Sequence, residues 1–329
     1  MKRQGAMPRL AIASLGGTVS MQAGSGLSAV RPELGCNEQL AKVPQLREMA
    51  SLEVATLGML ASASLGFAAL LDVLAWARGE VERGAQAVIL TQGTDTLEET
   101  AYFLDLLWPF DEPLVMTGAM RAASHPGSDG PANLLAAAQV ALAHSSRGRG
   151  VLVVMNDLVH RAASVRKAAS LALAAFESPG CGPLGHIVEG VVVYRLPPGR
   201  KEVLPLPHHI EHRVALLEAC LDADTALLQG VAAQGYQGLV VAGFGAGHVS
   251  AAWSTVLGQL VPVLPVIVAT RTGSGPTASA SYDFAGGEID LQAKGLHMAG
   301  RLCPRKCRIL LWLLIGTGRQ HLLNKWLPW

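Results

Sequence analysis

Short runs of aliphatic residues alternate with longer stretches of helical periodicity over the first 195 residues. The aliphatic runs look like strands of a parallel sheet that is covered on both faces, and they lie at 9–15, 87–93, 113–120, 150–157 and 189–195. Helical patterns lie at 66–84, 96–107 and 131–146. Strands that alternate with helices predict a doubly wound, mostly parallel α/β domain.

The alternation stops at "RLPPGRKEVLPLPHH", a stretch rich in proline and mixed charge that is typical of a linker. It resumes on a smaller scale, with strands expected at 213–219, 238–245 and 265–273 and helices at 222–235, 248–261 and 304–316. We therefore predict a larger N-terminal domain over 1–195, a linker over 196–212 and a smaller C-terminal α/β domain over 213–329.

Composition narrows the class of protein. Half of the 329 residues are hydrophobic and the net charge is +1, so nothing indicates binding to nucleic acid or to a membrane. No apolar run reaches the roughly 20 residues needed to span a bilayer, and the N-terminus lacks the apolar core of a signal peptide. We expect a cytoplasmic protein. His208 and His212 have the spacing of a ligand pair, but no third ligand is evident and we expect no metal.

Chemistry is expected where the strands end, because ligands of open α/β sheets bind outside the carboxyl ends of the strands. Gly-Gly-Thr at 16–18, which ends in Thr18, follows the first strand, and Thr94 and Asp95 follow a later one. Glycine lets backbone amides approach a ligand closely, and a threonine hydroxyl becomes a nucleophile when a base removes its proton. Lys167, ten residues beyond the run "GVLVVMND", is a candidate for that proton transfer.

Structural readings of the same residues stay open at this point. Gly-Gly-Thr after a strand is most often a turn, and an isolated lysine is most often a surface residue. Thr94 or Asp95 can cap the following helix, whose first turn carries Glu98 and Glu99 near the positive end of the helix dipole. We expect these two glutamates mainly to stabilise that helix.

Taken together, the segments resemble a single family. "ASLGGTVS" and "ILTQGTDTLEETAYFLDLL" resemble the two active-site signatures of the bacterial-type L-asparaginases and glutaminase-asparaginases. "MTGAMR", "SDGPANL" and "GVLVVMND" with its later lysine also resemble that family, as do "GFGAGHVS", "TRTGSG" and "GEIDLQAKGLHMAGRLCPRKCRILL". The similarity spans residues 9–316, and the motifs in this order are highly specific.

The resemblance implies hydrolysis of the side-chain amide of free asparagine, with glutamine as a minor substrate, through an acyl-enzyme on threonine and without a cofactor. By this resemblance Thr18 would be the nucleophile and Thr94 the second threonine near the scissile amide. Lys167 would tune the proton transfer of Thr94, and Asp95 would orient Lys167 and hold the substrate α-ammonium group. Holding both charged ends of a small zwitterion would also place its amide near the nucleophile.

Three further residues would bind the substrate by the same resemblance. Ser62, in "LASASL", matches the serine that holds the α-carboxylate, and the backbone carbonyl of Ala119 would accept from the leaving amide. Glu288 matches an acidic residue that completes the α-ammonium site of a neighbouring subunit, and a solvated loop glutamate is the alternative. If Glu288 does reach across, the active unit is a homo-oligomer, at least a dimer, with a homotetramer as the family expectation.

The sequence also departs from the family pattern. The loop at 19–34 contains no tyrosine, whereas many members carry one there. Ala63 and Ala246 stand where many members have polar residues, and their loss predicts weaker substrate binding and a preference for asparagine over glutamine. These departures keep open a catalytically inactive amino-acid-binding or regulatory homologue. A subunit of a tRNA-dependent amidotransferase, which is related to the same fold, is the other alternative.

Overall fold

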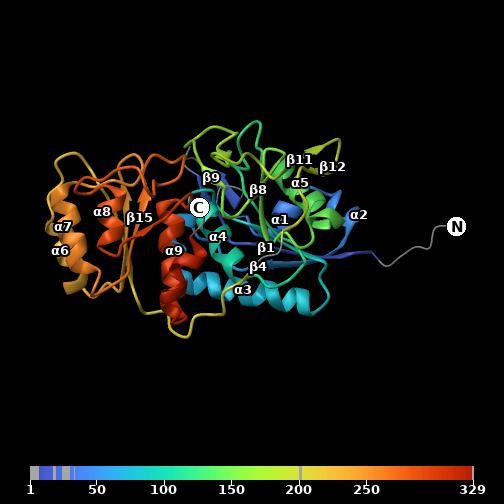
Figure 1. Ribbon diagram of the computed structural model, residues 1–329. Helices are drawn as coiled ribbons and strands as arrows, with labels where there is room; N and C mark the ends of the chain where they lie inside the picture. Colours follow the sequence, from blue (N-terminus) through green and yellow to red (C-terminus); the bar gives the residue numbers. More distant parts are fainter. Residues whose placement is uncertain (1–6, 18–19, 24–29, 33, 200–201, 328–329) are drawn as a thin grey trace. The chain divides into compact units, whose positions relative to one another are not determined.

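Aliphatic strands buried on both faces form the centre of each part of the computed structural model in Figure 1, which describes residues 7–17, 20–23, 30–32, 34–199 and 202–327. The chain forms two compact units, Met1–Val203 and Leu204–Trp329. The fold class predicted from the sequence is confirmed, since the first unit holds a large, mostly parallel sheet and the second a smaller parallel one. Within the described ranges, no helix is long and apolar enough to cross a membrane.

The first unit is built on a sheet of eight strands in the order β12-β11-β8-β7-β6-β5-β1-β4. Their bounds are β1 (Arg9–Ser14), β4 (Ser51–Thr56), β5 (Ala87–Thr91), β6 (Leu114–Thr117), β7 (Val151–Met155), β8 (Leu158–Arg161), β11 (Gly185–Val188) and β12 (Val191–Tyr194). The strands from β7 to β4 pair in parallel, so their carboxyl ends lie at the same end of the sheet. Four predicted strands, β1, β5, β6 and β7, are confirmed.

One predicted strand is present, but it is neither parallel nor buried on both faces as predicted. The run at 189–195 does contain a strand, β12, but this strand pairs antiparallel with β11 and ends the sheet order. Val191 is 62% exposed and Val193 is 40% exposed, because alternate residues of this strand face away from the core. A run of valines does not distinguish a strand covered on both faces from one covered on a single face.

Helices cover both faces of the large sheet. On one face, α1 (Cys36–Leu40), α2 (Leu46–Met49) and α5 (Gly130–Leu142) enclose a core that includes Leu10, Ile12 and Ile89. The opposite face carries α3 (Phe67–Glu82) and α4 (Leu97–Leu107) (Figure 1). A stacked ring pair, Phe67 and Phe103, joins these two helices. The remaining strands form two small ribbons, β2 (Met21–Ala23) with β3 (Val30–Pro32) and β9 (Arg166–Lys167) with β10 (Phe176–Glu177).

The second unit repeats this layering at a smaller scale. Its parallel sheet has the order β13-β14-β15-β16, with β13 (Val214–Glu218), β14 (Gly238–Gly243), β15 (Val266–Thr270) and β16 (His297–Met298). One face packs against α6 (Ala226–Ala233), α7 (Ala251–Leu260) and α8 (Glu288–Ala293). On β14, a Cβ at Gly238 would lie 2.8 Å from Leu311 of α9 (Pro304–Gly316), so this helix packs closely on the sheet. The short helix α10 (Leu323–Trp326) follows.

His212 anchors the start of the second unit to α9. Its Nε2 lies 2.7 Å from the carbonyl oxygen of Trp312, and its ring stacks on the Trp312 ring with centroids 4.6 Å apart. Because a carbonyl only accepts, Nε2 carries the hydrogen, and Nδ1 of His212 faces Nδ1 of His209 at 3.1 Å. Burial lowers the pKa of His212, an effect to which His209 adds while the bond to Trp312 and the charge of Glu211 oppose it.

This lowered pKa predicts that the folded protein loses stability in mild acid. Below the usual histidine pKa of about 6.5 the unfolded chain binds a proton at residue 212 that the folded chain resists, so stability falls as pH drops through that value. We expect the midpoint of thermal unfolding to fall further between pH 7.5 and pH 5.5 in the wild type than in His212→Gln, which keeps a donor for Trp312 but does not titrate. Equal falls in the two proteins would remove His212 as the cause.

Candidate active site

Lys167 is held where it meets the residues that follow β5. It lies in β9, which pairs with β10 through the partners Lys167 and Phe176. The Nζ atom of Lys167 lies 2.9 Å from Oγ1 of Thr94 and 2.9 Å from Oδ1 of Asp95. The ammonium group donates to both, so one cation joins a hydroxyl and a carboxylate. The structure thus brings together three residues that the sequence predicted for the site.

The three side chains differ in their contact with water. Thr94 is 5% exposed, and the side chains of Lys167 and Asp95 are 17% and 66% exposed. Water therefore screens the ion pair on the Asp95 side, and its contribution to folding is small. The same exposure leaves the Asp95 carboxylate open to a cationic group of a ligand, whereas Thr94 and the lysine stem are largely shielded.

Glu98 binds the backbone of Lys167, a contact that the sequence pattern did not indicate. Its side chain is buried, and Oε2 accepts a hydrogen bond from the backbone N–H of Lys167. Glu98 lies in the first turn of α4, four residues after Thr94. Glu98 thus binds the backbone of Lys167 while Thr94 binds its ammonium group. The expectation that Glu98 mainly serves the helix dipole is thus incomplete, because the carboxylate also ties β9 to α4.

Close backbone contact brings three strand-end loops together. A Cβ on Gly17, after β1, would lie 2.0 Å from the backbone nitrogen of Gly93, after β5. A Cβ on Gly93 would lie 2.7 Å from Oγ of Ser62, in the segment after β4. Gly17 also has a φ of 89°, which side chains other than glycine rarely adopt. Both glycines are therefore required by geometry, and they bring Ser62 against the residues that lead to Thr94.

A buried polar network lies beneath the loop that follows β1. Nε2 of Gln39, on α1, donates to Oγ of Ser14 at 2.8 Å and to Oγ of Ser20 at 2.7 Å. Oε1 of Gln39 accepts from Oγ1 of Thr91, the last residue of β5, at 2.9 Å. All four side chains are buried, and each would be costly to leave without a partner. Gln39 therefore fixes the ends of β1 and β5 and the residue at position 20.

Thr18 lies outside the described residues, as do 19, 24–29 and 33 of the loop that the sequence analysis singled out. The turn that carries Ala119 is described, and this residue is fully buried. The carbonyl before it, of Gly118, accepts from Nδ2 of Asn133 at 3.0 Å. The N–H after it, of Met120, donates to the carboxylate of Asp129 at 2.9 Å. Side chains at the start of α5 thus fix the peptide groups on both sides of Ala119.

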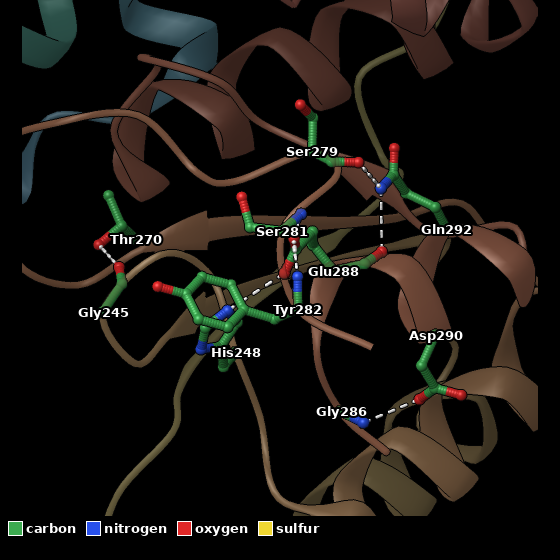
Figure 2. A network of polar contacts seen from close by, with 10 residues as sticks. All are labelled: Gly245, His248, Thr270, Ser279, Ser281, Tyr282, Gly286, Glu288, Asp290 and Gln292. Carbon is green, nitrogen blue, oxygen red and sulfur yellow. Dashed lines mark hydrogen bonds and ion pairs between the residues drawn. The ribbon is translucent and has the colours of Figure 1, made fainter. Parts of the chain in front are cut away.

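Glu288 belongs to the second unit, where Figure 2 shows it at the centre of a polar network. Its side chain is fully buried, so the alternative of a solvated loop glutamate is wrong. The carboxylate accepts from the N–H groups of Ser281 and Tyr282 and lies 3.2 Å from Nε2 of His248. Burial raises the pKa of Glu288, but the hydrogen bonds outweigh this and hold it below the usual glutamate value. The rings of Tyr282 and Phe284 pack against His248.

The polar groups at the strand ends of the first unit indicate which substrates the site can accept. A shielded hydroxyl beside an ammonium group, an exposed carboxylate and glycine-lined strand ends suit a polar amide with a charged end. Within the described residues, no three His, Cys, Asp or Glu side chains gather as metal ligands do. With its similarity to known proteins, this site defines the class of protein as an amidohydrolase.

Comparison with known proteins identifies the family. Residues 9–199 match the family model "Asparaginase, N-terminal" and residues 213–322 match "Glutaminase/Asparaginase C-terminal domain". The chain is 34% identical to the "Probable L-asparaginase periplasmic" of Haemophilus influenzae, with 95% of this chain and 90% of the relative covered. It is 32% identical to "L-asparaginase 2" of Escherichia coli, with 96% and 91% covered. The protein therefore belongs to the asparaginase family.

A solved structure agrees with this family assignment. The fold is similar to the crystal structure of a "Probable Cytoplasmic L-asparaginase" from Campylobacter jejuni, with a TM-score of 0.85 and 30% sequence identity. That comparison covers 97% of this chain and 98% of the other. A more distant relative, 29% identical over 94% of this chain and 75% of its own length, is a glutamyl-tRNA(Gln) amidotransferase subunit of Methanosarcina acetivorans. The relatives therefore include more than one kind of protein.

The contact between Gly93 and Ser62 predicts a large effect for a single methyl group. In Gly93→Ala the new Cβ would meet Oγ of Ser62 at 2.7 Å and Cα of Gly17 at 3.1 Å, so the loops must separate. We expect a loss of about 1–3 kcal/mol in the free energy of unfolding, measured with urea. Gly199→Ala is the matched control, because a Cβ there meets nothing within 4 Å. A Gly93→Ala protein as stable as this control would show that the loops are not in contact.

Proposed function

We propose that the protein is an L-asparaginase that hydrolyses free L-asparagine to L-aspartate and ammonia through an acyl-enzyme on Thr18. The observation that carries the proposal is the contact of the Lys167 ammonium with both Thr94 and Asp95 at the carboxyl ends of the parallel strands. Family membership supports the same reaction, since relatives of E. coli and H. influenzae are named as asparaginases. Thr18 itself lies outside the described residues, so its function is a proposal from the sequence.

In the first half of the proposed reaction, Oγ1 of Thr18 attacks the carbon of the side-chain amide. The C–N bond breaks, the proton of the threonine hydroxyl passes to the leaving nitrogen, and ammonia departs. In the second half a water molecule attacks the ester, the bond to Oγ1 of Thr18 breaks, and the hydroxyl regains a proton as aspartate is released. Lys167, by donating to Thr94, stabilises negative charge on that oxygen while protons move.

Recognition of the zwitterion would use groups on both sides of the reacting amide. Ser62 is proposed to hold the α-carboxylate and Asp95 the α-ammonium group, for which its exposed carboxylate is suited. The carbonyl of Ala119 would accept from the amide. We further propose that Glu288 of a neighbouring copy completes the α-ammonium site in a homo-oligomer, although its carboxylate already binds two N–H groups of its own unit.

The location of the protein is proposed to be cytoplasmic. The similar Campylobacter jejuni protein, which is named as cytoplasmic, supports this. Family membership alone does not decide it, because the relative from Haemophilus influenzae is named as periplasmic.

The mechanism predicts that two substitutions stop ammonia release in different ways. Thr18→Ala removes the proposed nucleophile, and we expect kcat on asparagine to fall at least about 10³-fold. Lys167→Met removes the ammonium but keeps the apolar stem, and we expect a fall of about 10²- to 10⁴-fold. Ammonia release is measured by a coupled glutamate dehydrogenase assay, and far-ultraviolet circular dichroism checks the fold.

The ammonia assay distinguishes the proposed mechanism from its alternatives. Unchanged release from Thr18→Ala would remove Thr18 from the mechanism. Binding of asparagine to the wild type with no release would favour an inactive amino-acid-binding homologue. Lys42→Met is the matched control for the lysine, because Lys42 is exposed and its Nζ lies 3.5 Å from the carbonyl of Ala123 rather than near Thr94.

Substrate preference gives a further prediction. Ala63 is exposed, and its methyl side chain cannot form a hydrogen bond beside Ser62; the side chain of Ala246 in the second unit cannot form one either. Glutamine has one more rotatable bond to order than asparagine, so it depends more on such contacts. We expect kcat/KM to favour asparagine by at least about tenfold, and Ala63→Gln to lower KM for both amides. A higher kcat/KM for glutamine would reject the preference.

A further inference from the structure

Thr96 stands at the N-cap of α4 but does not cap the helix. A threonine there usually accepts a hydrogen bond from an N–H of the first turn, which is worth about 1 kcal/mol per helix. Among the described residues the Thr96 side chain forms no such bond, and the N–H groups of Glu99 and Thr100 reach its carbonyl oxygen instead. Its Oγ1 donates to the backbone carbonyl of Ser62 at 2.9 Å. The hydroxyl therefore binds another segment rather than its own helix.

The contact with Gln92 fixes Thr96 as the donor in its hydrogen bond to Ser62. Gln92 is fully buried, and its Nε2 lies 3.1 Å from Oγ1 of Thr96 and 3.4 Å from the carbonyl oxygen of Gly93. A carbonyl only accepts, so the amide nitrogen of Gln92, rather than its oxygen, faces this pair of oxygens. Because Thr96 accepts from Gln92, its single hydrogen is free for Ser62, and each bond polarises the next.

Ser62 is the one buried residue of an otherwise open segment. It is 3% exposed, whereas Ala61, Ala63 and Ser64 around it are all exposed. Its carbonyl oxygen accepts from Thr96 and from the N–H of Leu65 at 3.1 Å, and its Oγ lies against Gly93. The hydroxyl of Thr96 thus links the start of α4 to the backbone of the residue proposed to bind the substrate carboxylate.

We propose that Gln92 and Thr96 are positioning residues that fix Ser62 for the α-carboxylate of the substrate. This inference rests on the proposed function of Ser62. The α-carboxylate does not change during hydrolysis of the side-chain amide, so its contacts are equally strong in the bound substrate and in the transition state. Loosening Ser62 therefore weakens binding more than it slows the chemical step, so KM rises by a larger factor than kcat falls.

The test compares Thr96→Val with Thr96→Ser. Valine matches threonine in shape but cannot donate, whereas serine restores the hydroxyl. For L-asparagine we expect KM to rise about 3- to 10-fold in Thr96→Val with kcat within about twofold of the wild type, and to return towards the wild-type value in Thr96→Ser. Gln92→Met, which removes the amide but keeps the length, is expected to raise KM in the same way by a smaller factor.

A double-mutant cycle isolates the connection to Ser62. If Thr96 acts through Ser62, then Thr96→Val changes KM by less than about twofold in a Ser62→Ala background. Independent effects of the two substitutions would overturn the inference, as would an unchanged KM in Thr96→Val. A kcat loss as large as the KM increase would also overturn it, because a general disturbance of the fold acts in that way.

Binding of the product L-aspartate, measured by calorimetry, separates this inference from the proposed function. We expect the Kd to rise in Thr96→Val and to recover in Thr96→Ser even if no ammonia is released. Absence of ammonia release by the wild type would reject the proposed hydrolysis, while the change in Kd would still decide the function of Thr96. Equal Kd values in the wild type and Thr96→Val would overturn the inference alone.

Discussion

The site depends on the close contact between the backbone at Gly17 and the backbone at Gly93. There is no room for a side chain at either position, because a Cβ on Gly17 would lie 2.0 Å from a backbone nitrogen. This contact joins the ends of β1 and β5 and leaves Ser62 against Gly93. The backbone at Gly17 is thus packed directly against the residue that precedes Thr94 and Asp95.

Polar side chains support this contact from two sides. Beneath it, Gln39 joins Ser14, Ser20 and Thr91 in a fully buried network. On the other side, Glu98 holds the backbone of Lys167 while Thr94 and Asp95 receive its ammonium group. Gln39 and Glu98 are not proposed to touch the substrate, but they hold the segments that carry the proposed site residues. Such supporting contacts keep the side chains of a site correctly oriented.

Much of the fold could be predicted from the sequence, because aliphatic runs and helical periodicity report burial directly. The strands β1, β5, β6 and β7 and the helix α9 follow those patterns. The strand β4 was missed because its burial alternates only weakly along "SLEVAT". Glu98 and Gln39 were missed for a different reason. Their partners lie 69 and 52 residues away in the chain, and no local pattern shows which distant group a buried polar side chain will meet.

Lys167 and Thr94 are separated by 73 residues of chain, and this separation bears on when the site forms during folding. Between them in the chain lie α4, β6, α5, β7 and β8, and Lys167 itself belongs to β9. Bringing such distant segments together costs loop entropy that local contacts do not offset. A growing chain on the ribosome would consequently carry the paired threonine and aspartate long before it could use them, and catalytic competence would be among the last properties to appear during folding.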